Sequence, residues 1–299
     1  MDTVAQTFPA SFLGALEPLR LRTRSVPTGG RFASQRARSK GAGIEFADVR
    51  PYVPGDDLRA LDGAAWLRMD RLFTRLFVQE EDLPVHILVD RSSSLGLVAL
   101  DDGMTKRRAT LQIAAALAYI ALRHLDRVTI HGFAGGSIGP LPSTSGASAF
   151  PTLLERLVAL PDGGETDIRQ ACRDLAARPG RRGMCVLISD FLDPQGLDAL
   201  HEGLGYLKHK IALIRVTRPG EDRPDLSGAL DLEDVESGAR LGIDADPSFA
   251  DRYAAAYRAF SDGLATLAAR HGALLHTVPI NAPVPETLAT LFAHGAFPG

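Results

Sequence analysis

Oxygen-bearing side chains follow two apolar segments of the sequence. Asp90, Ser92 and Ser94 occupy alternate positions at the end of the apolar run VHILVD and just after it, and Asp190 ends the apolar run MCVLISD. Thr166 lies between them along the chain, in the segment GGETDI. Carboxylate and hydroxyl oxygens are hard ligands that suit Mg²⁺ or Mn²⁺ in octahedral coordination. If the five side chains converge, they predict a metal site that water or a partner's carboxylate would complete.

Each of these residues also has a simpler structural interpretation. Asp, Ser and Thr are favoured at helix N-caps, because their side-chain oxygens accept hydrogen bonds from otherwise unpaired helix amides. Thr166 could therefore cap a helix over 167–178, and Asp190 could cap the helix that follows it. For any one residue, capping is the expected role. The combination in the order D-x-S-x-S, Thr, Asp is much less expected by chance, and it favours the metal site.

Strands and helices alternate through the part of the chain that contains these residues. The expected strands cover 85–90, 128–133, 184–190, 211–217 and 273–279, and two short strands within 229–243 are expected to pair about a Ser237-Gly238 turn. The expected helices cover 107–125, 150–160, 167–178, 248–271 and the segment from 285. This alternation predicts an α/β fold with a mainly parallel sheet and helices on both faces. Ligands of such folds bind beyond the carboxyl ends of the strands, where Asp90 and Asp190 are expected.

The first 83 residues have a different pattern and predict a small N-terminal α+β subdomain. A helix is expected over 9–22, and strands are expected over 44–52 and 71–81. Seven basic residues and no acidic residue occur from Arg20 to Lys40. Such a stretch could dock a partner or a nucleic-acid backbone, but its glycines and proline favour a solvated, flexible connection. We therefore predict two domains, residues 1–83 and residues 84–299.

Length, composition and charge exclude several classes of protein. A chain of 299 residues can bury a core without disulfides, and its two cysteines, Cys172 and Cys185, lack the spacing of a zinc site and suit a reducing compartment. The longest apolar window, 113–122, is about half the roughly 20 residues that a membrane helix needs. No basic region precedes the first apolar residues, as a signal peptide requires. A net charge of −3 gives no reason to expect nucleic-acid binding. We expect a soluble, cytoplasmic protein.

Together, Asp90, Ser92, Ser94, Thr166 and Asp190 resemble the metal-ion-dependent adhesion site of von Willebrand factor type A (VWA) domains. The resemblance implies a three-layer, Rossmann-like fold and a Mg²⁺ or Mn²⁺ ion that binds an acidic residue of a partner protein. It also implies separate roles for the ligands. The aspartate and serines of D-x-S-x-S hold the metal, Thr166 joins them when a ligand is bound, and Asp190 binds directly or through water.

A second resemblance lies in the segment before the large domain. GIEFADVRPYVPGDDLRALD (43–62) resembles the signature of the domain of unknown function 58 (DUF58) family, bacterial proteins with a VWA-like domain on their C-terminal side. The matching residues are Gly43, Glu45, Phe46, Asp48, Arg50, Tyr52, Pro54, Gly55, Asp56, Asp57, Arg59 and Asp62. The family has a tryptophan after the last of these, whereas here Gly63 stands there and the only tryptophan is Trp66. The role of the 56–62 cluster therefore stays open between a partner surface and a Pro-Gly turn before a capped helix.

The family resemblance also implies partners. It predicts an adaptor or co-chaperone that works with a MoxR-type AAA+ ATPase on an unknown protein client. The chain contains no G-x-x-x-x-G-K-[ST] nucleotide-binding loop, so any ATP hydrolysis would belong to the partner.

Two enzymatic alternatives rest on single motifs. GGSIG at 135–139 fits the G-x-S-x-G pattern of serine hydrolases, with Ser137 as nucleophile, Asp190 as acid and His271 or His276 as base. Two prolines follow within five residues of the serine, and they disfavour the helix that such a nucleophile must enter.

The second alternative is an aspartate-dependent phosphotransferase with Asp90 as nucleophile. Such enzymes commonly carry a second aspartate two residues later as acid and base, where this chain has Ser92. We therefore expect that the chain is not an enzyme and that its function is metal-dependent protein binding.

Overall fold

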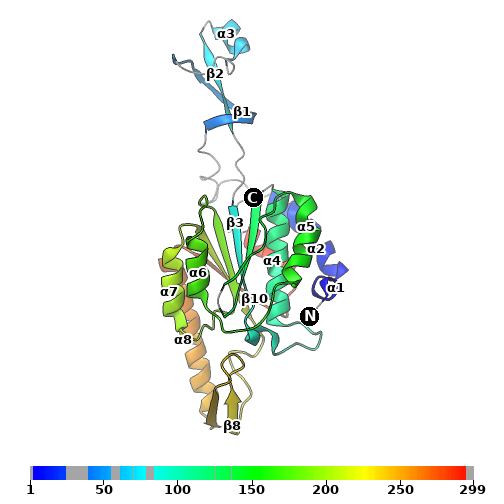
Figure 1. Cartoon of the computed structure of the whole chain (residues 1–299), viewed down its shortest axis with the longest axis vertical. Coiled ribbons are helices and arrows are strands. Elements are labelled where there is room, and N and C mark those ends of the chain that lie inside the picture. Colours follow the sequence, from blue (N-terminus) through cyan, green and yellow to red (C-terminus); the bar gives the residue numbers. More distant parts are fainter. Residues whose placement is uncertain are drawn as a thin grey trace. The chain divides into compact units, whose positions relative to one another are not determined.

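The computed structural model describes residues 3–24, 40–54, 61–69, 71–78, 84–124, 126–135 and 137–293. The predicted basic stretch lies largely outside these residues, as does most of the 56–62 cluster. The chain divides into two compact units (Figure 1). The larger contains residues 1–26 and 83–296, and the smaller contains residues 27–82 and 297–299.

A six-stranded sheet forms the centre of the larger unit. Its strands are β3 (Pro84–Asp90), β4 (Arg127–Phe133), β5 (Ser137–Pro140), β6 (Met184–Ser189), β7 (Lys210–Thr217) and β10 (Leu274–Pro279). The order is β10-β7-β6-β3-β4-β5, and every pairing is parallel except that of β4 with β5. Every residue of β6 is buried, as expected of a strand covered on both faces.

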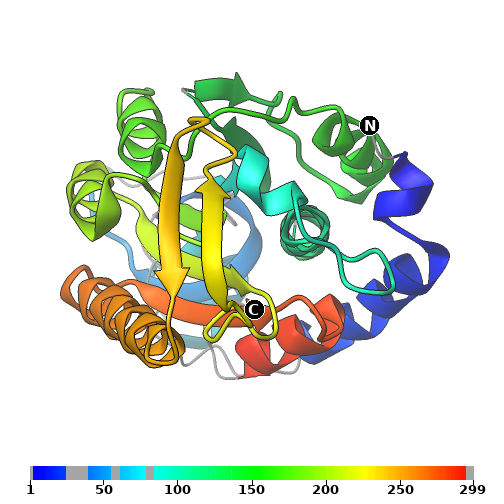
Figure 2. The ribbon, with the colours of Figure 1, turned by 90° about the horizontal axis from the view of Figure 1, so that it is seen from below.

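Helices cover both faces of this sheet (Figures 1 and 2). One layer consists of α6 (Ile168–Ala176), α7 (Gly196–Tyr206) and α8 (Phe249–Arg270). The other layer contains α1 (Val4–Thr7), α2 (Ala10–Arg24), α4 (Lys106–Arg123), α5 (Phe150–Val158) and α9 (Val284–Ala293). Thirteen of the eighteen residues of α4 are buried, because this alanine-rich helix lies between the sheet and its neighbouring helices. The predicted three-layer α/β fold is confirmed.

The smaller unit contains an antiparallel strand pair and a short helix. Strand β1 (Lys40–Pro51) pairs with β2 (Phe73–Val78), and α3 (Gly63–Met69) lies between them in the chain. The types of the predicted elements are correct here. The predicted boundary at 83–84 placed the first 26 residues in the N-terminal subdomain. In the structure these residues belong to the larger unit. The apolar face of α2 explains the difference, since Phe12 and Leu16 are buried.

A second antiparallel pair, the hairpin of β8 (Gly228–Glu233) and β9 (Arg240–Ala245), agrees with the strands predicted within 229–243. The edge strand β5 and the short helix α1 were not predicted, and α7 was expected only as a helix after Asp190, without bounds. Among the described residues, no helix is both long and apolar enough to span a membrane.

Candidate metal site at the carboxyl edge of the sheet

Strand β3 ends at Asp90, and the chain then turns so that its next polar groups surround that carboxylate. Both Asp90 and Ser92 are fully buried. The backbone N–H of Ser92 donates to Asp90 Oδ1 at 2.9 Å, and the hydroxyls of Ser92 and Ser94 are 3.3 Å apart. The 3-10 helix η2 (Ser93–Gly96) fixes this turn. The D-x-S-x-S segment therefore places three oxygen-bearing side chains in one small region.

The end of β6, which pairs directly with β3, supplies the next group of this site. Ser189 Oγ donates to Asp90 Oδ2 at 2.5 Å and accepts from the N–H of Phe191 at 2.9 Å. Phe191 has a φ of 64°, the only positive φ of a non-glycine residue in the described chain. Such a backbone costs on the order of 1–3 kcal/mol, and the ring of Phe191, buried in the core, holds it. This strained turn positions Asp190 beside Asp90.

The loop that carries Thr166 is tied to both neighbouring strand ends by backbone hydrogen bonds. The N–H of Gly163 donates to the carbonyl of Arg91 at 3.0 Å, and the N–H of Gly135 donates to that of Glu165 at 2.6 Å. Gly164 has a φ of 87°, and a Cβ there would lie 2.9 Å from Gly135 Cα. Only glycine therefore allows this close approach, which sets Thr166 at the site.

Helix capping does not account for these side chains. The N-cap of α6 is Asp167 rather than Thr166. The Asp167 side chain accepts a hydrogen bond from the N–H of Gln170. Helix α7 has Gln195 as its N-cap, and Asp190 instead accepts from the N–H of Leu192 at 3.1 Å. Ser92, the N-cap of η2, makes no side-chain hydrogen bond that caps this 3-10 helix. The capping interpretation of Thr166 and Asp190 is therefore wrong.

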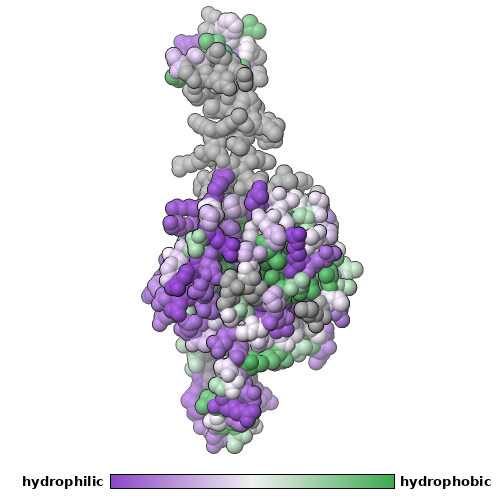
Figure 3. All heavy atoms as spheres, in the orientation of Figure 1, coloured by the Kyte–Doolittle hydropathy of each residue, from purple (hydrophilic) through white to green (hydrophobic). Residues whose placement is uncertain are grey.

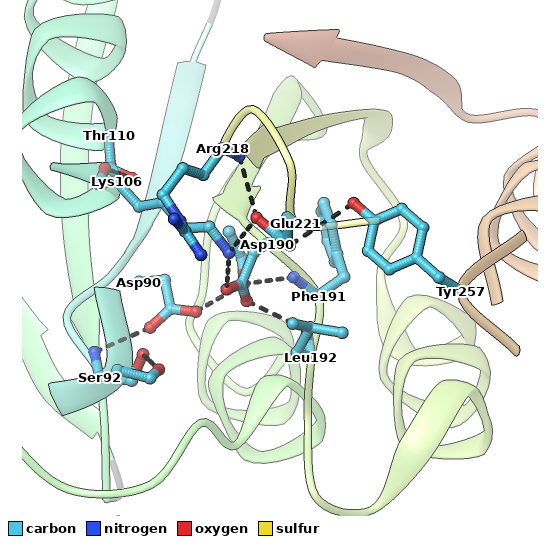
Figure 4. A network of polar contacts seen from close by, with 12 residues as sticks. Asp90, Ser92, Lys106, Thr110, Asp190, Phe191, Leu192, Arg218, Glu221 and Tyr257 are labelled. Carbon is cyan, nitrogen blue, oxygen red and sulfur yellow. Dashed lines mark hydrogen bonds and ion pairs between the residues drawn. The ribbon is translucent and has the colours of Figure 1, made fainter. Parts of the chain in front are cut away.

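A buried ion-pair network borders the site (Figure 4). Lys106 Nζ lies 2.9 Å from Asp190 Oδ2 and 2.8 Å from Glu221 Oε2. Glu221 also accepts from the N–H of Arg218 at 2.9 Å. Burial lowers the pKa of Lys106, but the two carboxylates outweigh it and the net shift is upward. Lys106 thus stays charged and offsets part of the negative charge here.

Asp90 makes no such ion pair in the network of Figure 4, where it bonds to uncharged groups. Burial and then the nearby carboxylate of Asp190 raise the pKa of Asp90 to about 7, against the hydrogen bonds from Ser189 and Ser92 that lower it. A buried carboxylate in this setting is stabilised by a cation.

The hydroxyl of Thr166 provides a test of whether these residues fit a hard divalent cation. Thr166 is 2% exposed, and its Oγ1 has no hydrogen-bond partner among the described residues. An unpaired buried hydroxyl costs on the order of 1–3 kcal/mol, and a metal ligand role would remove that cost. In the described chain no three His, Cys, Asp or Glu side chains form a group that could hold a metal. A cation here would therefore depend on the hydroxyls, which suits Mg²⁺ or Mn²⁺ better than softer metals.

Comparison with known proteins assigns the chain to a family. Residues 48–262 match the family described as "Protein of unknown function DUF58". The chain belongs to this family. The predicted DUF58 membership is confirmed. Similar curated proteins include uncharacterized proteins of Mycobacterium bovis and Mycobacterium tuberculosis, each 29% identical to this DUF58 chain over 254 residues, which is 82% of this chain and 78% of theirs.

Solved structures similar to this DUF58 protein share little sequence with it. One is the conserved hypothetical protein BatB from Bacteroides thetaiotaomicron, with 16% identity, a TM-score of 0.43, and 72% of this chain and 98% of the other covered. Another is the SpRpn10 VWA domain, with 13% identity, a TM-score of 0.42, and 70% and 94% covered.

The structure brings all five predicted site residues of the DUF58 chain to the carboxyl edge of the sheet. It also adds three residues that the sequence analysis missed, Ser189, Lys106 and Glu221. Only Lys106 had a recognisable signal, because it is one of four lysines in a chain with 33 basic residues.

The serine-hydrolase motif lies in a different structural context from the one that a nucleophilic serine needs. Ser137 begins the edge strand β5 rather than a turn into a helix.

Proposed function

We propose that this DUF58 protein is a metal-dependent protein-binding adaptor or co-chaperone. In this proposal Mg²⁺ or Mn²⁺ is held by Asp90, Ser92, Ser94, Thr166 and Asp190, and the ion accepts a carboxylate oxygen from an acidic residue of a partner protein. The chain's own residues hold the ion and orient the incoming carboxylate, and no covalent bond is made or broken.

The observation that carries the proposal is the buried hydroxyl of Thr166. It has no partner in the described chain, it does not cap the helix that follows, and yet a strained glycine loop fixes its position. A neutral hydroxyl beside two carboxylates leaves a divalent cation able to accept one more anionic ligand. This arrangement therefore favours binding of a partner carboxylate over a purely structural role.

The surroundings of the site also suit a protein partner. Leu97 and Leu192 are exposed, and each lies within three residues of a side chain at the site. Figure 3 shows hydrophobic surface along the lower edge of the larger unit, beside the hairpin, whereas the surface over α6 and α7 is hydrophilic. Protein interfaces combine apolar contacts with hydrogen bonds and charged groups, so exposed apolar side chains beside a polar site suit a protein partner.

The MoxR-type AAA+ ATPase, the protein client and the cytoplasmic location belong to the same proposal, and family resemblance supports the ATPase. Both cysteines are buried and unpaired, which is compatible with a reducing compartment. The ATPase would supply the nucleotide chemistry for which this chain has no motif.

Calorimetric titration of Mg²⁺ and Mn²⁺ into chelator-stripped protein tests the central claim. We expect saturable binding of one ion by the wild type and its loss in Asp90→Asn, which removes a ligand charge but keeps the side-chain shape. The matched control is Asp101→Asn, because Asp101 is acidic, exposed and close to the site in sequence. Folded wild type that binds neither ion would overturn the proposal. So would an equal loss of binding in both variants.

A further inference from the structure

The β8–β9 hairpin lies across the carboxyl edge of the sheet, over the candidate site. Figure 2 shows the two strands crossing this edge, with their turn beside η2 and the start of α6. The hairpin is thus a part of the chain that could control access to the site.

At the tip of the hairpin, the carboxylate of Glu236 bonds directly to residues of the site. Its Oε1 accepts from the hydroxyl of Ser94 at 2.7 Å and from the N–H of Ser94 at 3.4 Å. Its Oε2 accepts from the N–H of Thr166 at 3.2 Å. The carboxylate of Glu236 therefore contacts two of the five residues assigned to the metal, one through each of its oxygens. Within 231–240, Glu236 is the only residue that is not exposed.

The turn is built to present this carboxylate. Asp234 Oδ1 accepts from the N–H groups of Glu236 and Ser237, at 2.8 and 2.9 Å. Gly238, with a φ of 70°, completes the turn and donates its N–H to the carbonyl of Asp234. Apart from this tip, nearly all residues of the two strands are at least partly exposed. A two-stranded hairpin is only marginally stable by itself, so its attachment at Glu236 can open without disturbing the core.

Charge argues that Glu236 is placed here as a ligand. The site already contains the carboxylates of Asp90 and Asp190, and Lys106 is bound by Asp190 and Glu221. A further carboxylate next to this group is repelled unless a cation lies between them. Glu236 therefore has the charge and the position expected of a partner's acidic residue at this site, although it belongs to the same chain.

We propose that Glu236 is an internal acidic ligand that occupies the partner's place, so that the hairpin tip must leave before a partner carboxylate can bind. This inference rests on the proposed function and adds its regulation. It also specifies the partner's chemistry, which is a glutamate or aspartate presented on an exposed turn. The adaptor would then be closed by default and opened by a partner that competes with its own hairpin.

A peptide that reproduces the hairpin tip tests the proposal in trans. The probe is a cyclic peptide of residues 232–241, and a second peptide carries Glu236→Gln. Their affinities are measured by calorimetry with saturating Mg²⁺ against wild type, a Glu236→Gln protein and a Glu233→Gln protein. The last is the matched control, because Glu233 lies on the same hairpin and pairs with Arg240 rather than with the site.

We expect the Glu236→Gln protein to bind the acidic peptide about tenfold more tightly than wild type or Glu233→Gln. This is the ratio expected if the tip is closed about nine-tenths of the time. Binding should be lost with the glutamine peptide and in the presence of a chelator. Amide hydrogen exchange gives a second readout. The N–H groups of Ser94 and Thr166 should exchange faster in Glu236→Gln than in the control.

The outcomes separate this inference from the proposed function. Equal peptide affinity for wild type and Glu236→Gln would overturn the inference, because the tip would not compete. Absence of peptide binding by a protein that binds Mg²⁺ would also overturn it and leave the metal site standing. Failure to bind Mg²⁺ at all would overturn both.

Discussion

Thr166 and Asp167 are adjacent in the chain, but only Asp167 caps helix α6, while the hydroxyl of Thr166 is buried without a hydrogen-bond partner in the described chain. The two residues therefore separate the structural role from the proposed binding role. A substitution at each should affect a different property of the protein.

We predict that Asp167→Ala lowers the free energy of unfolding by about 1 kcal/mol, as loss of an N-cap does, and keeps Mg²⁺ binding. Thr166→Val, which has nearly the same shape, should lower the Mg²⁺ affinity at least tenfold and leave the metal-free protein as stable as wild type, because it removes an unpaired hydroxyl. Urea unfolding in chelator, together with calorimetry, measures both effects. The opposite assignment, with Thr166→Val destabilising and still binding Mg²⁺, would show that Thr166 is structural.

Most of the sheet could be predicted because its strands are buried on both faces and are therefore apolar throughout. Strand β5 could not, since it has four residues and exists only by pairing with β4. Helix α7 contains internal glycines, which are poor helix formers. One of them, Gly203, lies where α7 approaches α6 closely, since a Cβ there would lie 3.2 Å from Arg169 Cα, tighter than most such contacts. That close approach is tertiary, and no local pattern reveals it.

The site was predictable only where it follows strand ends. Asp90 and Asp190 end or follow apolar runs, so their meeting at one edge follows from parallel pairing of the strands. Lys106 reaches Asp190 across 84 residues, and Glu236 reaches Ser94 across 142. These contacts depend on how a helix and a hairpin pack against the sheet, and the sequence alone contains no spacing that indicates them.

The ion pairs of Lys106 lead to a second prediction. Its side chain is 13% exposed, and those of Asp190 and Glu221 are 7% and 9% exposed. Lys106→Met leaves both carboxylates without their cation, so the free energy of unfolding in chelator should fall by about 3–5 kcal/mol. Saturating Mg²⁺ should restore part of this loss by stabilising Asp190.

The matched control for Lys106→Met is Arg240→Met, which breaks an exposed pair with Glu233. Exposed pairs contribute about 0–1 kcal/mol, and the effect should not depend on Mg²⁺. Urea unfolding of each variant with and without Mg²⁺ measures the difference. If Lys106→Met costs no more than the control, the ammonium is not part of a buried network.

Three histidines, one on β3, one on β4 and one just before β7, predict a pH dependence. His86 Nδ1 and His131 Nε2 are 3.2 Å apart, and the ring of His209 packs against His86. Burial, then His209 and Arg178, lower the pKa of His86 to about 4. Burial and then His86, with smaller effects of Arg178 and His209, lower that of His131 to about 3. The folded chain therefore keeps both rings neutral where the unfolded chain protonates them.

Because both folded pKa values lie below the unfolded value of about 6.5, these two histidines contribute stability above pH 6.5 and lose it as the pH falls toward 4. The double variant His86→Gln/His131→Gln should show a flatter decline over this range in urea unfolding. The difference from wild type isolates the histidines from Asp90, whose raised pKa acts in the opposite direction. Parallel curves for the two proteins would contradict the prediction.

The loop glycines allow a last test of how the site is positioned. Gly164→Ala introduces a Cβ 2.9 Å from Gly135 Cα at a φ of 87°, so the loop must move and carry Thr166 with it. We expect a loss of about 1–3 kcal/mol in the free energy of unfolding and at least tenfold weaker Mg²⁺ binding. Gly146→Ala is the matched control, since its φ is 81° but nothing lies within 4 Å of the added Cβ. It should show only the backbone cost of about 1–2 kcal/mol and bind Mg²⁺ like wild type. Equal Mg²⁺ affinity in the two variants would mean that the close approach of the loop to Gly135 does not set the position of Thr166.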